Sequence, residues 1–255
     1  MMSEKQRDAE KQRRLGKELD NLEEQMKATE GYRLRLKIRA LSNSYYVFEA
    51  NYRNLTVALD RVGKIENLTT LWAVDNRDKL ERFLAEITRL WHNFLAGAKT
   101  LVDHTRVFKN DVYKGKGFEE VYQAKVERDL VDSPVVSFVQ DLRHYALHKQ
   151  LPITSAEFSF QGGEGGTIKD HDSTIKLDVN SLREWDRWKA KSRVYLDALD
   201  DKVKIKEVAE QYEAAIRSFY QWFGEQQNQL HRVEFEELSN LETQYSQVWQ
   251  ELEEA

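Results

Sequence analysis

The chain has 255 residues, of which 40% are apolar and 33% charged, and its formal net charge is −5 at pH 7. This length suits one large or two small domains and is enough to bury a sizeable core. A high charged fraction with only two prolines and eleven glycines favours long, solvent-wrapped helices over a β-sandwich or barrel. The acidic balance excludes a broadly basic nucleic-acid binder but leaves room for a local basic site.

The absence of cysteine and of long apolar runs indicates in which cellular compartment to expect the protein. The chain has no cysteine, which excludes a disulfide framework and a thiolate metal site and makes a cytoplasmic location the expected one. No run approaches the roughly 18–20 consecutive apolar residues of a membrane span, so we expect no membrane partner. Residues 1–20 are too polar for a signal peptide.

Two helices are predicted at the start of the chain. Residues 3–30 form a charged helical arm, whose thin apolar stripe either pairs with another helix or frays. That stripe consists of Leu15, Leu19, Leu22 and Met26. Residues 31–62 have a fuller stripe at helical spacing, formed by Leu34, Ile38, Leu41, Tyr45, Phe48, Tyr52, Leu55 and Leu59. Gly63 then ends this second helix.

A long amphipathic helix is predicted next, over residues 77–113. A linker at 64–75 precedes it, and Asp75 or Asn76 caps its start. Gly97 lies in the middle of this helix, where a glycine costs about 1 kcal/mol relative to alanine. We therefore expect another helix to pass close to Gly97.

Residues 133–152, SPVVSFVQDLRHYALHKQLP, are predicted as a short helix with two unlike faces. A break at 114–117 and a short helix at 118–131 precede it. Ser133 suits the N-cap, a proline takes the first helical position, and Pro152 ends the helix. The expected core face carries Val135, Phe138, Val139, Leu142 and Ala146. The opposite face carries Arg143, His144, Leu147 and His148. Such a face suits contact with a phosphate, a metal or a second copy of the protein better than plain solvent.

The apolar pattern changes to a period of two after this helix, which predicts a β-hairpin over 153–179. The alternating residues are Thr154, Ala156, Phe158, Phe160, Ile175, Leu177 and Val179. The connection between the strands, QGGEGGTIKDHDS, is rich in glycine. It lacks the lysine and the following helix of a phosphate-binding loop and contains a glutamate, so we expect no phosphate site there.

Two further helices are predicted, a tryptophan-rich one at 182–200 and a last one at 204–253. Asn180 or Ser181 caps the former, and Asp200 and Asp201 end it. The last helix loses apolar density in its second half, which either extends alone, pairs with the N-terminal arm or binds a partner. The predicted fold is therefore mainly α, with long charged terminal helices. A helical bundle at 31–223 contains the hairpin, and residues 1–30 and 224–255 form the arm and the tail.

Residue types alone support two interpretations of the central helix. His144 and His148 are one turn apart and supply half of a zinc site, whose third ligand must come from a remote carboxylate or His104. Alternatively, Arg143 and His148 pair with carboxylates or backbone at a helix or subunit contact. In a functional arrangement, His104 or Arg106 of the preceding long helix faces the central helix.

Residues 143–148, RHYALH, resemble the signature of the HEPN superfamily. That signature is an arginine, a polar residue, and a histidine after four to six intervening residues, on a helix of a small bundle. Here four residues intervene and His144 is the polar one. The order of LAGAKTLVDHTR, FVQDLRHYALHKQLP, a hairpin and a tryptophan-rich helix also resembles a group of bacterial proteins.

The resemblance implies an endoribonuclease that needs neither metal nor cofactor and acts as a homodimer, in a toxin or phage-defence setting. RNA is then the substrate, and an antitoxin or another protein binds through the helical arms. Arg143 would hold the scissile phosphate, and His148 would move the proton of the 2′-hydroxyl, with His144 beside them. These residue types suit the roles, because arginine gives a fixed positive fork and histidine titrates near neutrality.

The sequence departs from the HEPN pattern in several places. Gln150 stands where the toxin branch of the superfamily often has a tyrosine, two residues after the histidine. The long arms and the hairpin exceed a minimal HEPN domain. The alternative function is therefore a non-catalytic helical scaffold or protein-interaction module with a HEPN-like fold.

Overall fold

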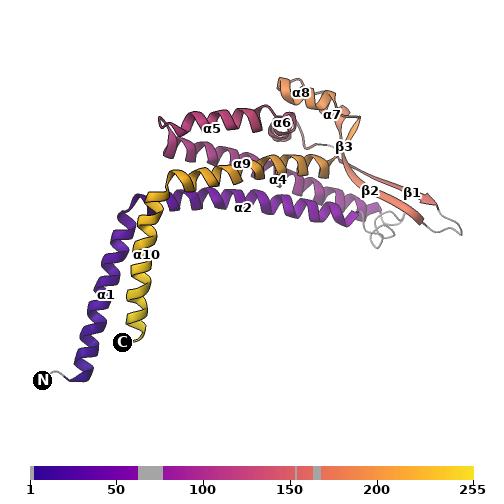
Figure 1. The fold of residues 1–255 in the computed structure, drawn as a ribbon. Helices are drawn as coiled ribbons and strands as arrows, with labels where there is room; N and C mark the ends of the chain where they lie inside the picture. Colours follow the sequence, from indigo (N-terminus) through magenta and orange to yellow (C-terminus); the bar gives the residue numbers. More distant parts are fainter. Residues whose placement is uncertain (1–2, 63–76, 153, 163–167) are drawn as a thin grey trace. The chain divides into compact units, whose positions relative to one another are not determined.

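A computed structural model describes residues 3–62, 77–152, 154–162 and 168–255 (Figure 1). The chain is mainly helical with one small antiparallel sheet, which confirms the predicted fold class. It divides into two compact units. We call residues 1–40 with 221–255 the terminal unit, and residues 41–220 the central unit. The divisions fall inside two long helices, whereas the sequence placed them at residues 30 and 223.

The terminal unit is built on helices from both ends of the chain. It contains α1 (Glu4–Ala28), the start of α2 (Glu30–Val62), the end of α9 (Ile205–Leu230) and α10 (Arg232–Glu253). Helix α1 begins with a capping box between Ser3 and Gln6 and packs along α10 (Figure 1). Their shared core consists of Leu15, Leu19, Leu22 and Val248, with Leu241, Tyr245 and Leu252 packed against it. The arm and the tail therefore pair with each other, as one of the expected alternatives had it.

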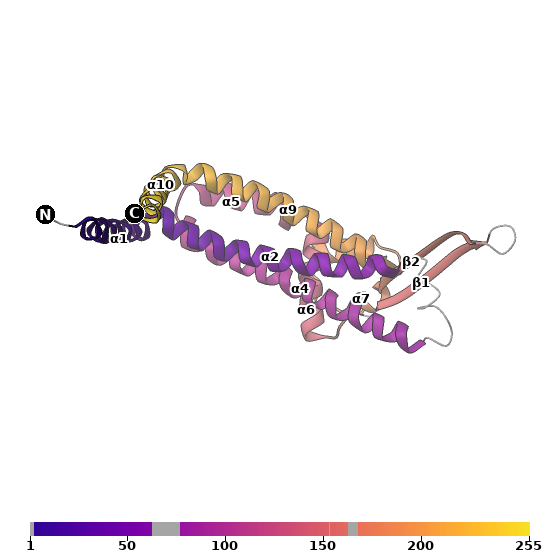
Figure 2. The same ribbon diagram turned by 90° about the horizontal axis from the view of Figure 1, so that it is seen from below.

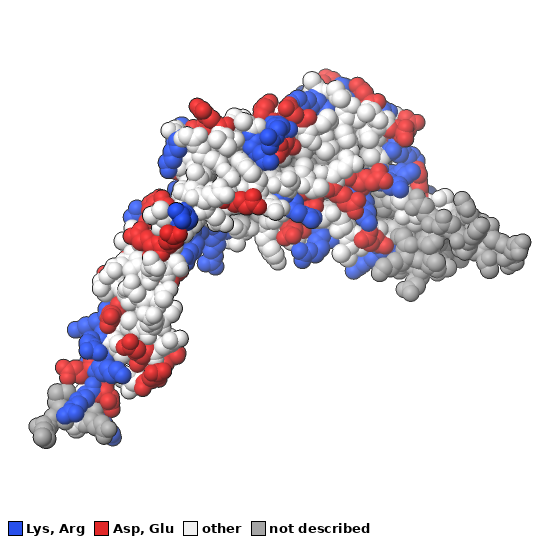
Figure 3. Space-filling view, viewed as in Figure 1, with Lys and Arg blue, Asp and Glu red and all other residues white. Residues whose placement is uncertain are grey.

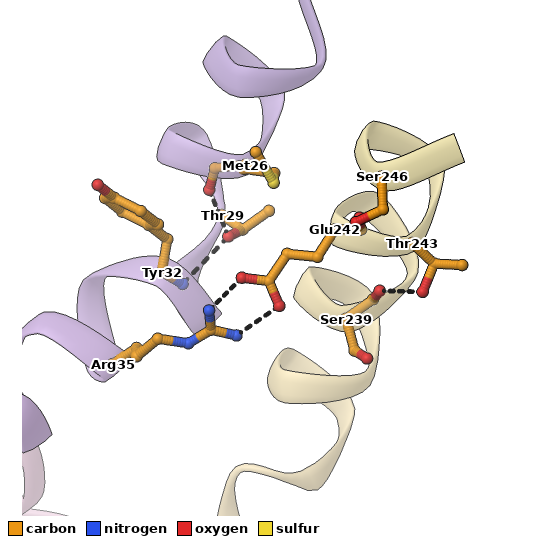
Figure 4. Close-up of polar contacts among 8 residues, drawn as sticks. All are labelled: Met26, Thr29, Tyr32, Arg35, Ser239, Glu242, Thr243 and Ser246. Atoms are coloured by element: carbon orange, nitrogen blue, oxygen red, sulfur yellow. Dashed lines mark hydrogen bonds and ion pairs between the residues drawn. The ribbon is translucent and has the colours of Figure 1, made fainter. Parts of the chain in front are cut away.

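Close contacts fasten α2 to its neighbours in the terminal unit (Figure 4). Thr29, between α1 and α2, donates to the Met26 carbonyl at 2.7 Å and accepts from the Tyr32 amide at 3.1 Å. Arg35 of α2 forms a two-pronged ion pair with Glu242 of α10.

Gly31 lets the backbones of α2 and α10 approach closely. A Cβ atom at this position would overlap the carbonyl oxygen of Glu234 and lie 3.2 Å from the Cβ of Leu238. Only a residue without a side chain fits here.

The single helix predicted at 204–253 is wrong, because α9 ends at Leu230 and α10 begins at Arg232. The chain turns at His231, whose φ and ψ are −113° and 23°. No glycine or proline marks this turn. Packing of α10 against α1 outweighs a local helix propensity that would otherwise continue the helix.

An aromatic core holds the helices of the central unit together. Helix α4 (Arg77–Tyr113) runs along the central part of α2 (Figure 2) and also contacts α9. Phe94 of α4 meets Phe48 of α2 and Tyr212 of α9, with ring centroids 5.6 and 5.8 Å apart. A Cβ on Gly97 would lie 3.4 Å from the Phe48 Cα, which confirms the expected close passage of another helix.

Three strands form the sheet, in the order β1-β2-β3. The predicted hairpin is confirmed as β1 (Thr154–Gly162) and β2 (Ile168–Asp178), with Thr154 opposite Leu177. The sequence missed β3 (Lys202–Lys204), which pairs antiparallel with the end of β2. Three residues carry too short a pattern to be recognised as a strand.

The helix predicted at 182–200 is also wrong, because the segment holds two short helices, α7 (Val179–Arg183) and α8 (Ala190–Asp197). Asp178, not Asn180 or Ser181, caps α7. Trp185 and Trp188 lie in the turn between the two helices, and the Trp188 indole donates to the Leu182 carbonyl at 2.7 Å. Burying both indoles against the central helix requires this turn.

The break expected at 114–117 is present, with Gly115 at a φ of 73°. After it come α5 (Phe118–Val126) and a π-helical turn (Glu127–Val131). The expectations for Gly63, for the linker at 64–75, for Asp75 and Asn76 and for residues 163–167 lie outside the described residues. None of the helices described is long and apolar enough to cross a membrane.

Candidate functional site

Helix α6 (Pro134–His148) carries the RHYALH sequence and forms as predicted. The Ser133 hydroxyl accepts the Val136 amide, and the proline takes the first turn. Pro152 follows four residues after the last helical one. The helix belongs wholly to the central unit, which holds it against α4 and α8.

The core face of α6 is shifted from the predicted one. Phe138, Val139 and Leu142 are buried as expected, whereas Val135 and Ala146 are only half-buried. Val136, Asp141 and Tyr145 are buried as well. Tyr145 packs on Trp185 and Trp188, with ring centroids 5.4 and 5.8 Å away. The turn that holds Trp185 and Trp188 therefore covers this side of α6 and buries it.

A cavity of about 670 Å³ opens beside α6, bounded by α4, α5, the π-helical turn, the start of α8 and α9. All of its lining residues belong to the central unit. Its floor is apolar and includes Leu101, Val126, Leu130, Val136, Ile216 and Phe219. The size falls within the roughly 300–1,000 Å³ of typical small-molecule sites.

Basic side chains dominate the polar part of this cavity. Its lining includes six basic side chains and one carboxylate, that of Asp141. The basic residues are Lys99, Arg106, Arg143, Arg187, Lys189 and Lys191, which we call the cationic rim. Figure 3 shows basic side chains gathered over the region between α5 and α6. A protein that is acidic as a whole thus concentrates positive charge at one cavity.

Carboxylates next to the cavity neutralise part of the cationic rim. Asp103 forms ion pairs with Lys99 and, at 3.7 Å, with Arg106. Lys191 pairs with Asp132. These three cations are therefore less available to a ligand.

Arg143 and Arg187 carry the uncompensated charge of the rim. Neither has an ion-pair or hydrogen-bond partner within the ranges that the structure describes. The alternative in which Arg143 pairs with a carboxylate at a helix contact inside the chain is thus not observed in these ranges. Arg106 lines the same cavity as Arg143, as one expectation had it.

Asp141 fixes the edge of the cavity. Its buried carboxylate accepts the Lys189 amide at 3.1 Å and the Ser192 hydroxyl at 2.7 Å. The Lys189 ammonium lies 3.0 Å from its other oxygen. The α8 N-cap residue, Lys189, provides no side-chain cap, and Asp141 of α6 instead ties the first turn of α8 to α6 through the Lys189 amide and the Ser192 hydroxyl. This contact places Lys189 and Lys191 on the rim.

The two histidines of α6 lie together on its exposed side. The ring centroids of His144 and His148 are 4.4 Å apart, and that of Trp185 is 5.6 Å from His144. His144 lines the cavity and His148 does not. Desolvation and the neighbouring His148 lower the pKa of His144, and Arg187 and Arg143 lower it further. This lowered pKa favours the neutral form of His144, which can accept a proton, although Asp141 acts in the opposite sense.

A zinc site finds no third ligand in the described part of the chain. His104 binds the Ser44 hydroxyl through Nδ1 at 2.6 Å and does not line the cavity. No group of three or more His, Asp or Glu side chains that could hold a metal ion occurs within those ranges.

Hydrogen bonds of hydroxyl groups join the helices that line the cavity. The amide of Gln140 donates to the Tyr212 hydroxyl at 2.6 Å, and Thr105 bonds to Tyr220. Burial raises the pKa of Tyr122 to about 12 and that of Tyr220 well above its ordinary value. These phenols stay protonated.

The sequence predicted the α6 residues of this site but missed the rest of its rim. Arg187, Lys189 and Lys191 place three cations in five residues on either side of Trp188. That spacing was a usable signal, but in a continuous helix Lys189 would point away from Arg187 and Lys191. The turn before α8 brings them to the cavity instead.

No protein-family model, curated protein or solved structure matches this chain.

Proposed function

We propose that the protein is a metal-independent endoribonuclease that uses the α6 residues Arg143, His144 and His148. The observation that carries this proposal is the arrangement on α6, where an arginine free of carboxylates lies beside two adjacent histidines. RNA would approach this exposed side of the central unit. The HEPN-like signature in residues 143–148 supports the same roles.

The chemistry is a transesterification followed by release. The 2′-oxygen of a ribose attacks the adjacent phosphorus and the bond from phosphorus to the 5′-oxygen breaks. A neutral histidine takes the 2′-hydroxyl proton, and a protonated one gives a proton to the leaving 5′-oxygen. Arg143 binds the phosphate as its negative charge redistributes. The products are a 2′,3′-cyclic phosphate and a 5′-hydroxyl.

A homodimer is part of the proposal. Leu147, which directly precedes His148 at the end of α6, is 49% exposed, and an apolar side chain there suits a contact with a second copy. A two-fold axis at α6 would bring two sets of histidines together, one for each proton transfer. A cytoplasmic toxin or defence protein, held by an antitoxin, fits this arrangement.

The test compares cleavage of a labelled single-stranded RNA by the wild type, Arg143→Ala and His148→Ala, all in EDTA. Losing a general acid or base costs about 10²–10⁴-fold, so we expect each variant to lose at least 100-fold. Arg53→Ala is the matched control, because Arg53 is exposed on α2 and pairs only loosely with Glu49, at 3.7 Å.

The same RNA with 2′-deoxyribose at every position should resist cleavage, because it lacks the nucleophile. Equal cleavage by all four proteins, or cleavage of the deoxy substrate, would contradict the proposal.

A non-catalytic scaffold is the second candidate function. It is favoured by the terminal unit, where Val233 and Trp249 of α10 are 67% and 46% exposed. Exposed side chains of this kind suit a protein partner. Wild-type protein that binds RNA or a protein but shows no cleavage under any tested condition would favour this role.

A further inference from the structure

The cavity beside α6 has a composition that the ribonuclease proposal does not use. RNA cleavage needs an exposed arginine and histidines, whereas this cavity continues inward to an apolar floor. Most of the apolar lining is aliphatic, contributed by leucine, isoleucine and valine. Val131 keeps 39% of its surface exposed although it lines the cavity. Apolar surface left open inside a cavity is a place for an apolar ligand group.

The aromatic lining residues are already packed against one another. The rings of Tyr122 and Phe219 meet edge to face with centroids 5.8 Å apart, and Phe219 meets Tyr220 at 5.5 Å. This arrangement offers aliphatic walls rather than a pair of parallel rings between which a base would stack.

The charge of the cationic rim favours an anion that carries more than one negative charge. Arg143 and Arg187 are uncompensated, and Lys189 is 78% exposed at its side chain despite the contact with Asp141. Two arginine forks match the tetrahedral oxygens of a phosphate, which carries up to two negative charges. A single carboxylate would leave much of this positive charge uncompensated.

We propose that the cavity binds an organic phosphate with an aliphatic body, an alkyl phosphate. The phosphate lies between Arg143 and Arg187, and the chain extends over Leu130 and Val131 towards the floor. This site shares Arg143 with the proposed ribonuclease site, but binding of the alkyl phosphate does not depend on RNA cleavage.

The π-helical turn is a second feature that shapes the cavity for a ligand. The Asp132 amide donates to the Glu127 carbonyl at 2.8 Å, five residues back, which widens the helix at the cavity wall. Turns of this kind are rare and occur frequently at functional sites. Leu130 and Val131, which belong to this turn, both line the cavity.

Isothermal titration calorimetry on the full chain tests the proposal with a series of alkyl phosphates from ethyl to octyl. Each methylene that leaves water should tighten binding about fourfold until the floor is filled. Inorganic phosphate should bind at least 100-fold more weakly than octyl phosphate. Octanoate replaces the phosphate head group by a carboxylate. Adenosine 5′-monophosphate keeps the phosphate but replaces the alkyl chain by a nucleoside. Both should bind more weakly than octyl phosphate.

Two pairs of variants locate the bound molecule. Arg187→Gln should weaken octyl phosphate about tenfold, whereas Arg128→Gln, on the same wall but outside the lining, should leave it unchanged. Val131→Ser should weaken octyl phosphate but not inorganic phosphate. Its control is Val121→Ser, because Val121 is 52% exposed on α5 and does not line the cavity. All four positions are exposed enough that the variants are expected to fold, which thermal melting confirms.

Affinity that does not change with chain length, or equal binding by Arg187→Gln, would overturn the proposal. Tightest binding of adenosine 5′-monophosphate or octanoate would overturn the aliphatic body or the phosphate head, respectively. If the ribonuclease proposal also holds, octyl phosphate should inhibit cleavage by occupying Arg143. Only this inhibition rests on the proposed function. Calorimetry measures binding of octyl phosphate without RNA, so a failure of the binding proposal is distinguishable from a failure of the ribonuclease proposal.

Discussion

The helices inside each of the two units are packed in different ways. In the central unit, Phe48, Phe94 and Tyr212 form one continuous aromatic core. In the terminal unit, a single row of leucines on α1 meets α10, and an ion pair and a glycine contact fasten α2. A wide core spreads its free energy over many contacts, whereas a thin seam depends on a few. Adding a methyl group at a close helix contact should therefore act more sharply in the terminal unit.

Substitution of glycine makes the largest predicted contrast. Gly31→Ala should destabilise the terminal unit by about 3 kcal/mol, because the new methyl group overlaps the backbone of Glu234, which cannot rotate away. Gly97→Ala should change stability by less than about 1 kcal/mol. Its methyl group meets the flexible Asn51 amide at 3.1 Å, and the gain in helix propensity offsets that contact.

Urea unfolding measures both variants, and hydrogen exchange shows which unit loses protection. Gly16→Ala is the control within the terminal unit, because nothing lies within 4 Å of that position. It should stabilise α1 by up to about 1 kcal/mol. Equal stabilities for Gly31→Ala and Gly16→Ala would show that α2 and α10 do not need their close approach.

Removal of a carboxylate tests the polar contacts of the two units. Asp141→Ala should cost about 2 kcal/mol, because it leaves the Lys189 amide and the buried Ser192 hydroxyl without their acceptor. Glu242→Ala removes only an ion pair whose two side chains are 46% and 41% exposed, and should cost about 0.5 kcal/mol or less. Adding 1 M salt should shrink the second effect and leave the first. A larger loss for Glu242→Ala would reverse this order.

Acid sensitivity gives the smallest predicted effect. Lys176 and then Lys202 lower the pKa of Glu157 to about 2 by hydrogen bonds of 2.5 and 2.7 Å. A depressed carboxyl pKa adds stability above the unfolded value of 4.5, and this stability is lost as pH falls towards 2. The side chain is 38% exposed, so solvent screening limits the contribution to less than about 1 kcal/mol.

Glu157→Gln should therefore lower stability at pH 7 and flatten its decline between pH 4.5 and 2, as followed by urea unfolding at each pH. An unchanged decline would mean that the two lysines do not hold the ionised form. In that case the sheet of the central unit would not gain from its exposed carboxylate.

Much of the fold could be predicted because the long helices show a strong apolar period. The bounds of α4 and the close passage at Gly97 came from the sequence alone. The turn at His231 could not be predicted, because it depends on α1, which is remote in sequence. The turn holding Trp185 and Trp188 could not be predicted either, because it exists to bury these rings against Tyr145.

The candidate site also has a part that could be predicted from the sequence and a part that could not. Arg143, His144 and His148 follow one another on one helix, so their proximity could be predicted from helical spacing. The remaining basic residues come from α4 and from the start of α8. Their meeting depends on Asp141, which joins residues 48 apart in the chain. No local pattern indicates such a contact.

The π-helical turn has a consequence for how such a cavity arises. Its hydrogen bond encloses one residue more than an α-helical turn, so it has the geometry left by a single-residue insertion in a regular helix. Deleting one residue between Glu127 and Val131 would restore a regular helix and rotate the preceding side chains by about 100°. A change of one codon in an evolving gene would therefore reshape this wall of the cavity.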